Sequence, residues 1–159
     1  MKAITLWQPW ASLLALGLKH ETRSWGTSYR GQMAIHAAKR TFEPMDFAIF
    51  DPIFAKAVTD ALKEAQMSIH RLPFGEVLAL GDLVKCYKIL GVYTPEQSKG
   101  HLVTVEDGDI IRDIWITSDD LLFGDWTPGR FAWEFINMKM LDKPVPAQGG
   151  QRIWNWNYR

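Results

Sequence analysis

Basic side chains are concentrated in the first forty residues, where they could bind an anionic or polar ligand. Residues 1–40 carry six lysines and arginines but only one acid, Glu21. The other 119 residues carry twelve basic and seventeen acidic groups, so the whole chain is formally neutral. An even basic coat would indicate general binding to a phosphate backbone, whereas one basic segment indicates a local site. The six basic residues are Lys2, Lys19, Arg23, Arg30, Lys39 and Arg40.

Motifs for several common chemistries are absent. The sequence has no glycine-rich phosphate loop, no H-E-x-x-H motif and no G-x-S-x-G nucleophile elbow. Its four histidines lack metal-ligand spacing, and one cysteine, Cys86, cannot form a thiolate zinc cluster. We therefore expect no metal and no cofactor. Gly149-Gly150-Gln151 matches a tripeptide of release factors that hydrolyse peptidyl-tRNA, but we interpret it here as a loop.

Length and composition predict a single globular domain over residues 1–159. Hydrophobic residues make up 47% of the chain and charged residues 23%, which suits a domain with its own core. No apolar stretch approaches the roughly 18–20 residues that span a bilayer, and Met1-Lys2 begins no signal peptide. One cysteine fits a reducing compartment. We expect a cytoplasmic protein with no membrane partner, and the oligomeric state stays open.

In the first half of the chain, the predicted elements surround the basic segment. Alternating apolar residues predict strands over 3–7 and 32–38. A helix over 8–16 is expected between them, with Pro9 in its first turn and Gly17 at its C-terminal end. Residues 19–25 indicate a loop or a strand. Residues 42–69 are helical in pattern, and Asp51-Pro52 divides them into two expected helices.

The second half is predicted to be mostly strand. A long strand is expected over 76–90, and a hairpin over 101–105 and 110–117 turns around Asp107-Gly108. Thr127-Pro128-Gly129 is typical of a turn before a strand over 130–140, and 153–158 could form a last strand. Six or seven strands with helices only in the first half indicate a mixed α/β (α+β) fold. The expected form is a small barrel or curled sheet with helices packed outside.

The first forty residues contain a specific combination of short motifs. These are Trp7-Gln8-Pro9-Trp10-Ala11, Gly17-Leu18-Lys19, Glu21-Thr22-Arg23, Arg30-Gly31 and Ile35-His36-Ala37-Ala38-Lys39. Together with residues 75–80, 124–130 and 149–156, they strongly resemble the ASCH domain, a PUA-like β-barrel, over nearly the whole chain. The resemblance implies a small PUA-like barrel whose cleft beside the first helix accepts RNA, DNA or a nucleoside.

One branch of that family implies an enzyme. Some members resemble small bacterial amidohydrolases that remove an acyl group from N(4)-acetylcytidine with a lysine, a threonine and a glutamate. The Lys-x-x-Thr spacing of Lys19 and Thr22 matches them, which implies Thr22 as nucleophile and Lys19 as its base. A threonine hydroxyl needs such a base, and a lysine serves only when its pKa is well below about 10.4. In a regular strand the two side chains point to opposite faces, so their contact requires a turn or bulge.

No motif in this sequence matches the position of the catalytic glutamate in that family. It should precede the turn at Pro128-Gly129, where Glu106, Asp119 and Asp120 are candidates, and we choose Asp120 by its distance from that turn. Glu21 is a second member of the candidate catalytic set, either as a ligand-contacting group or as the ion-pair partner of Arg23.

Another branch of the family implies a non-catalytic module that binds RNA or DNA with the same segment. Arg23, Arg30, His36 and Lys39 would contact phosphates or base edges, although the position of His36 between alanines slightly favours a core histidine. A tryptophan would stack a base, which contributes roughly 1–3 kcal/mol. The expected partner is thus a modified cytosine nucleoside, or RNA or DNA. The predicted binding residues are Trp7, Gln8, Trp10, Arg23, Ser24, Trp25, Arg30, His36 and Lys39.

Overall fold

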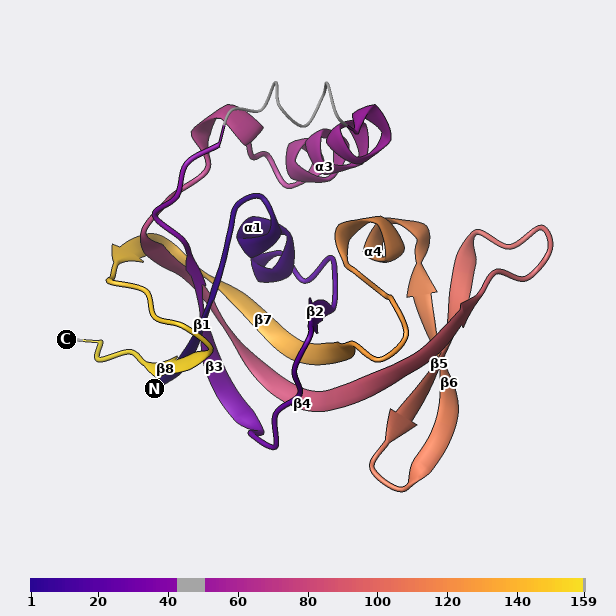
Figure 1. The fold of residues 1–159 in the computed structure, drawn as a ribbon. Helices are drawn as coiled ribbons and strands as arrows, with labels where there is room; N and C mark the ends of the chain where they lie inside the picture. Colours follow the sequence, from indigo (N-terminus) through magenta and orange to yellow (C-terminus); the bar gives the residue numbers. More distant parts are fainter. Residues whose placement is uncertain (43–50, 159) are drawn as a thin grey trace.

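A single strongly curved sheet dominates the computed structural model, which describes residues 1–42 and 51–158 (Figure 1). Helices α1 and α4 lie over its concave side, and α3 lies beyond α1. The elements are β1 (Lys2–Leu6), α1 (Trp10–Ala15), β2 (Glu21–Arg23), β3 (Gly31–Ala37), α3 (Pro52–Glu64), the 3-10 helix η1 (Ile69–Arg71), β4 (Glu76–Tyr93), β5 (Gly100–Asp107), β6 (Ile110–Thr117), α4 (Ser118–Phe123), β7 (Phe131–Pro146) and β8 (Ile153–Asn155).

The sheet contains eight strands and remains open. Its main path runs β2-β7-β4-β3-β1-β8, while β5 pairs with β4 and β6 pairs with β5. Among the described residues no pairing joins β2 to β8, so the expected closure into a barrel is not confirmed. The mixed α/β class is confirmed, with eight strands where six or seven were predicted and with α4 as an unexpected helix in the second half.

The curvature originates in the two longest strands. β4 pairs with β3 along its first half and with β5 along its last residues, and β7 runs antiparallel beside most of it. The register between β4 and β7 shifts at three places, two of them near Gly81 and Val84. Such bulges bend a strand and increase its twist, which turns this sheet into a bowl. The concave side of the bowl holds the helices.

A buried apolar cluster fixes α1 against the sheet. Leu14 from α1 packs with Ile4, Met33, Leu78 and Trp133, and each of these side chains is fully buried. Burying one such side chain contributes roughly 1.5–3 kcal/mol. The segment that follows α1 is therefore held tightly at the sheet.

Local signals explain where the helices begin and end. Asp51 caps α3 by accepting a hydrogen bond from the Phe54 backbone N–H, as its sequence position predicts. Gly17 follows α1 with φ of 72°, which favours glycine. The other predicted helix, over 42–50, lies almost wholly outside the described residues. No described helix is long and apolar enough to cross a bilayer.

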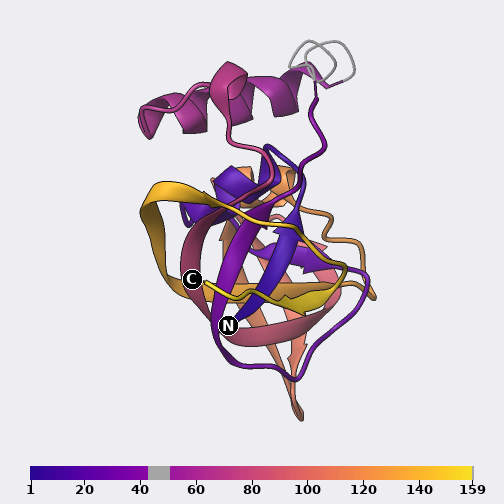
Figure 2. The same ribbon diagram turned by 90° about the vertical axis from the view of Figure 1, so that its left-hand side faces the viewer.

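The two ends of the chain meet at one side of the sheet. β8 lies antiparallel to β1, and the Met1 ammonium group donates to the Trp156 carbonyl at 3.0 Å. Figure 2 shows this side of the molecule, with N and C close together and α3 well separated from the strands.

Candidate functional site

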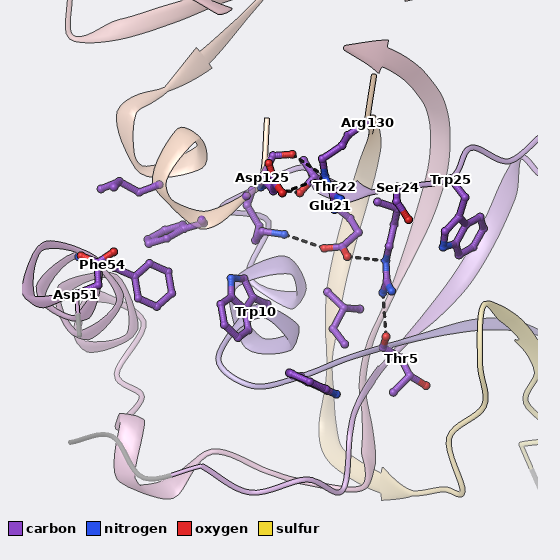
Figure 3. A pocket seen from close by; sticks show the side chains of 17 residues that line it. Thr5, Trp10, Glu21, Thr22, Ser24, Trp25, Asp51, Phe54, Asp125 and Arg130 are labelled. Carbon is purple, nitrogen blue, oxygen red and sulfur yellow. Dashed lines mark hydrogen bonds and ion pairs between the residues drawn. The ribbon is translucent and has the colours of Figure 1, made fainter. Parts of the chain in front are cut away.

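A cavity of about 700 Å³ opens between the concave face of the sheet and helices α1, α3 and α4 (Figure 3). Its size lies within the range of roughly 300–1,000 Å³ that is usual for small-molecule sites. Eight residues predicted from the sequence line it: Trp7, Trp10, Lys19, Glu21, Thr22, Arg23, Ser24 and Trp25. The remaining lining residues are Thr5, Leu6, Asp51, Phe54, Leu122, Phe123, Gly124, Asp125 and Arg130.

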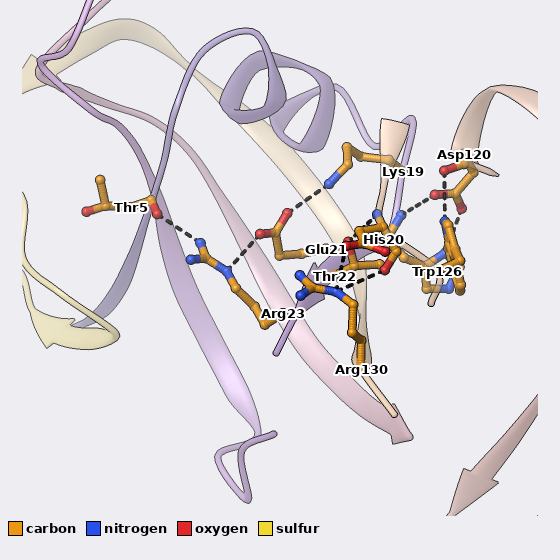
Figure 4. A network of polar contacts seen from close by, with 10 residues as sticks. Thr5, Lys19, His20, Glu21, Thr22, Arg23, Asp120, Trp126 and Arg130 are labelled. Carbon is orange, nitrogen blue, oxygen red and sulfur yellow. Dashed lines mark hydrogen bonds and ion pairs between the residues drawn. The ribbon is translucent and has the colours of Figure 1, made fainter. Parts of the chain in front are cut away.

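A buried row of charged groups forms part of the cavity wall (Figure 4). The Lys19 Nζ lies 2.8 Å from Glu21 Oε2, and the Arg23 Nε lies 2.8 Å from Glu21 Oε1. The Lys19 side chain is 1% exposed, that of Glu21 8% and that of Arg23 24%. Arg23 also donates from Nη2 to the Thr5 carbonyl, at 2.9 Å. One carboxylate thus faces two cations in a largely water-excluded place.

The backbone of β2 explains this row. β2 pairs with β7 through Glu21↔Trp133 and Arg23↔Phe131, and its other edge carries no strand among the described residues. Side chains two positions apart share one face of a strand. Glu21 and Arg23 therefore point the same way, and Lys19 reaches Glu21 from the residues just before the strand.

Thr22 lines the same cavity but makes a different contact. Its Oγ1 accepts a hydrogen bond from the Asp125 backbone N–H at 2.9 Å. The structure gives no hydrogen bond between Lys19 and Thr22 in its described part, so the expected direct contact is not formed. The physical reason is that the Glu21 carboxylate is a stronger partner for an ammonium group than a neutral hydroxyl.

Gly124 allows the close approach of Asp125 to Thr22. A Cβ atom at Gly124 would lie 3.2 Å from Thr22 Oγ1 and Cγ2, and 3.0 Å from Trp126 Nε1. These distances are shorter than ordinary van der Waals contact, so any larger residue must push Thr22 or Trp126 aside.

We expect Gly124→Ala to destabilise the protein by about 1–2 kcal/mol, because overpacking displaces well-packed neighbours. The midpoint of urea unfolding measures this. Gly91→Ala is the matched control, since a Cβ there meets nothing within 4 Å. Equal stability of the two variants would show that Thr22 is not confined by Gly124.

Asp125 and Arg130 were not singled out by the sequence, although residues 124–130 belong to the family pattern. Asp125 Oδ1 accepts hydrogen bonds from Thr127 N–H and Oγ1, and these bonds lower the pKa of Asp125 below its ordinary value. Arg130 Nε lies 3.4 Å from Asp125 Oδ2. The Asp-x-Thr spacing ahead of Pro128-Gly129 was the signal, because aspartate commonly caps such turns.

Asp120, our choice of catalytic carboxylate, does not line the cavity. It is buried in α4 and accepts hydrogen bonds from the His20 backbone N–H at 2.9 Å and from His20 Nδ1 at 2.7 Å. Asp120 therefore anchors the residue between Lys19 and Glu21 instead of facing Thr22. The other two candidates, Glu106 and Asp119, also lie outside the lining.

Aromatic side chains form the rest of the wall. Trp10 stacks on Phe54 with ring centroids 5.7 Å apart, and Trp25 packs edge-on against Trp133 at 4.8 Å. In Figure 3, Trp10 and Phe54 lie on one side of the cavity and Trp25 on the other. Trp7 is 55% exposed and marks the opening. A flat ring system could bind between these walls.

Four predicted binding residues lie outside the cavity lining. Gln8 is buried, accepts from the Ser12 N–H and donates to the Pro73 carbonyl, so it holds α1 in place. Arg30 donates to two nearby backbone carbonyls. Lys39 is exposed beyond the end of β3. These three residues are not brought together with Lys19 and Thr22.

His36, the fourth, is a core histidine. It is 1% exposed, its Nδ1 lies 3.1 Å from Thr5 Oγ1, and its Nε2 lies 3.1 Å from the Ala147 carbonyl. Both ring nitrogens are engaged, so none is free for a base edge. Burial lowers the pKa of His36 below 6.5.

This pKa predicts a loss of stability in weak acid. As the pH falls below 6.5, the unfolded His36 takes up a proton that the folded one resists, which favours unfolding. Stability continues to fall until the pH is below the lowered pKa that His36 has in the folded protein. Thermal unfolding between about pH 7 and 5 should show it, and a flatter curve is expected for His36→Asn. Identical slopes for the two proteins would contradict this origin.

No family model and no curated protein matches this chain. Within residues 1–42 and 51–158, no three histidine, cysteine, aspartate or glutamate side chains are grouped so that they could hold a metal ion. The polar side chains of the cavity include the hydroxyl groups of Thr22 and Ser24, the buried lysine–glutamate pair, arginines and the Asp125 carboxylate, and tryptophans contribute to its wall.

Proposed function

We propose that this protein is an amidohydrolase that removes acyl groups from N(4)-acylated cytosine nucleosides such as N(4)-acetylcytidine. Its curved sheet would then be the PUA-like barrel of an ASCH-family protein. One observation carries the proposal: Lys19, Glu21 and Thr22 line a single aromatic-walled cavity. A nucleophile, a base and a proton donor are the three groups that amide hydrolysis by a hydroxyl requires.

The shape of the cavity supports a nucleoside as substrate. A volume of about 700 Å³ accommodates a pyrimidine with its sugar, and Trp7, Trp10 and Trp25 contribute indole rings to the wall. Stacking on an aromatic ring contributes roughly 1–3 kcal/mol per base. A small ligand also meets less repulsion from the acidic second half of the chain than a long nucleic acid does.

The lysine–glutamate pair supplies both proton transfers in this proposal. The Lys19 ammonium first passes a proton to Glu21 across their 2.8 Å contact. The neutral amine of Lys19 then turns from Glu21 to Thr22 and takes its proton as Oγ1 attacks the acyl carbonyl. The C–N bond breaks while the Glu21 carboxyl group protonates the exocyclic nitrogen. Cytidine leaves, and the acyl group stays on Thr22 as an ester.

A second round of the same transfers frees the enzyme. Lys19 again gives its proton to Glu21 and then accepts one from a water that attacks the ester. Glu21 returns its proton to the departing Thr22 oxygen, and the carboxylic acid is released. Glu21 thus takes the role for which the sequence had suggested Asp120.

The surroundings of Thr22 favour this role. The Asp125 N–H already donates to Thr22 Oγ1, so it would stabilise negative charge on that oxygen. The hydroxyl proton of Thr22 is left to point toward a base. Arg23, which lines the same cavity, would supply positive charge to stabilise the developing oxyanion.

The decisive experiment follows cytidine release from N(4)-acetylcytidine by chromatography. We expect the wild-type protein to release cytidine and acetate in equal amounts. No release would reject the amidohydrolase. If the protein then binds RNA or DNA with an affinity that falls steeply with salt, it is the non-catalytic ASCH module instead.

A further inference from the structure

Two arginines lie over tryptophan rings of the cavity wall. The Arg40 Cζ lies 4.2 Å from the centroid of the Trp7 ring, and the Arg152 Cζ lies 5.0 Å from that of Trp25. Both arginines are exposed, and both indoles line the cavity. Arg152 has φ of 54°, a backbone conformation that is uncommon for a non-glycine residue.

These two arginines differ from their neighbours in having no polar partner. Arg23 is bound to Glu21 and the Thr5 carbonyl, Arg130 contacts Asp125, and Arg30 donates to backbone carbonyls. By contrast, neither Arg40 nor Arg152 forms an ion pair or hydrogen bond with any residue in 1–42 or 51–158.

A guanidinium group over an aromatic ring keeps N–H donors available. The contact with the ring gives these donors no oxygen acceptor, and the five N–H bonds match the oxygens of a phosphate. The tryptophans also restrict the side chains, so less freedom is lost on binding. Two restrained arginines without an acidic partner thus lie beside tryptophans of the cavity wall, Arg40 at the exposed Trp7 and Arg152 at Trp25.

We propose that the cavity takes its cytosine nucleoside with a phosphate attached, as a nucleotide, and that Arg40 beside Trp7 and Arg152 beside Trp25 bind this phosphate. The inference rests on the proposed function for the nucleoside itself. With the base between the aromatic walls, the sugar lies toward the exposed Trp7, where a phosphate stays in contact with water. The acidic remainder of the chain disfavours a long polyanion, so a mononucleotide is the expected ligand.

Calorimetric titration with cytidine, cytidine 5′-monophosphate and the trinucleotide CpCpC tests the proposal. The wild-type protein should bind the monophosphate about tenfold more tightly than cytidine, since hydrogen bonds to charged groups are the strong ones. The affinity advantage of the monophosphate over cytidine should decrease as the salt concentration is raised. In the double variant Arg40→Gln/Arg152→Gln, the ratio of the two affinities should fall close to one.

A charge-matched control separates local binding from a general field effect. Lys63→Gln/Arg71→Gln removes the same charge from exposed positions outside the cavity lining and should keep the tenfold ratio. The proposal is overturned if cytidine and its monophosphate bind equally, if neither binds, or if the ratio persists in the Arg40/Arg152 variant.

The trinucleotide identifies the source of the phosphate. CpCpC that binds no more tightly than the monophosphate supports a free mononucleotide, whereas an arginine-dependent gain assigns the site to a nucleotide within a strand. Hydrolysis of N(4)-acetylcytidine is measured in a separate experiment. If the monophosphate binds through the two arginines but no cytidine is released, the phosphate site is supported and the amidohydrolase is rejected. If cytidine is released but the arginines do not affect binding of the monophosphate, only the phosphate site is rejected.

Discussion

Thr22→Ala is expected to lower kcat for N(4)-acetylcytidine hydrolysis by about 10³-fold or more, because the covalent route needs the hydroxyl oxygen. The cavity and its charged row would persist, so KM should change far less than kcat. Steady-state rates of cytidine release measure both constants. Mass spectrometry of quenched mixtures should find the acyl group on the wild-type chain and none on the variant.

Two further variants make this result specific. Thr22→Ser keeps the oxygen and should retain much of the activity. Thr59→Ala removes an exposed threonine of α3, whose hydroxyl donates to the Ala55 carbonyl, and should leave the rate unchanged. If Thr22→Ala retains more than about a tenth of wild-type kcat, Thr22 is not the nucleophile.

Glu21→Gln is expected to destabilise the fold by about 3–5 kcal/mol, because it leaves the buried Lys19 ammonium and the Arg23 guanidinium without a counter-charge. For a chain of this length the melting temperature should fall by roughly 10 °C or more. Thermal and urea unfolding measure the loss. Glu106→Gln removes an exposed carboxylate and should stay within about 0.5 kcal/mol of wild type.

A double-mutant cycle shows whether the charge pair is responsible. Lys19→Met combined with Glu21→Gln removes both members, so its cost should be clearly smaller than the sum of the two single changes. Additive costs would mean that Lys19 and Glu21 do not stabilise one another, despite their 2.8 Å separation.

Elements whose signals are local were predicted well. The cap at Asp51, the turn at Gly108 and the stop at Gly17 each depend on a few adjacent residues, and all three stand where expected. Helix α4 was missed, because its six residues are too few to show a helical period. Its cap by Thr117 is the one local signal that could have revealed it.

The gathering of eight candidate residues in one cavity could be anticipated, whereas their pairing could not. Lys19, Glu21 and Thr22 are close in sequence, but which of them touch depends on the short strand β2 and its pairing with β7, about a hundred residues away. The contact of Thr22 with Asp125 spans 103 residues for the same reason. Asp120 was placed by distance along the chain, and the chain folds it toward His20 instead.

The contacts of Gln8 show what the stretch Gln8-Pro9-Trp10-Ala11 does in the structure. The Gln8 amide group joins the start of α1 to the Pro73 carbonyl, so the letters Q-P-W-A record how a helix is anchored rather than what is catalysed. Evolution could keep that anchor while exchanging the lysine at 19 or the threonine at 22. Proteins gathered by the anchor alone would then share an architecture and differ in chemistry, and these two positions would sort binders from hydrolases.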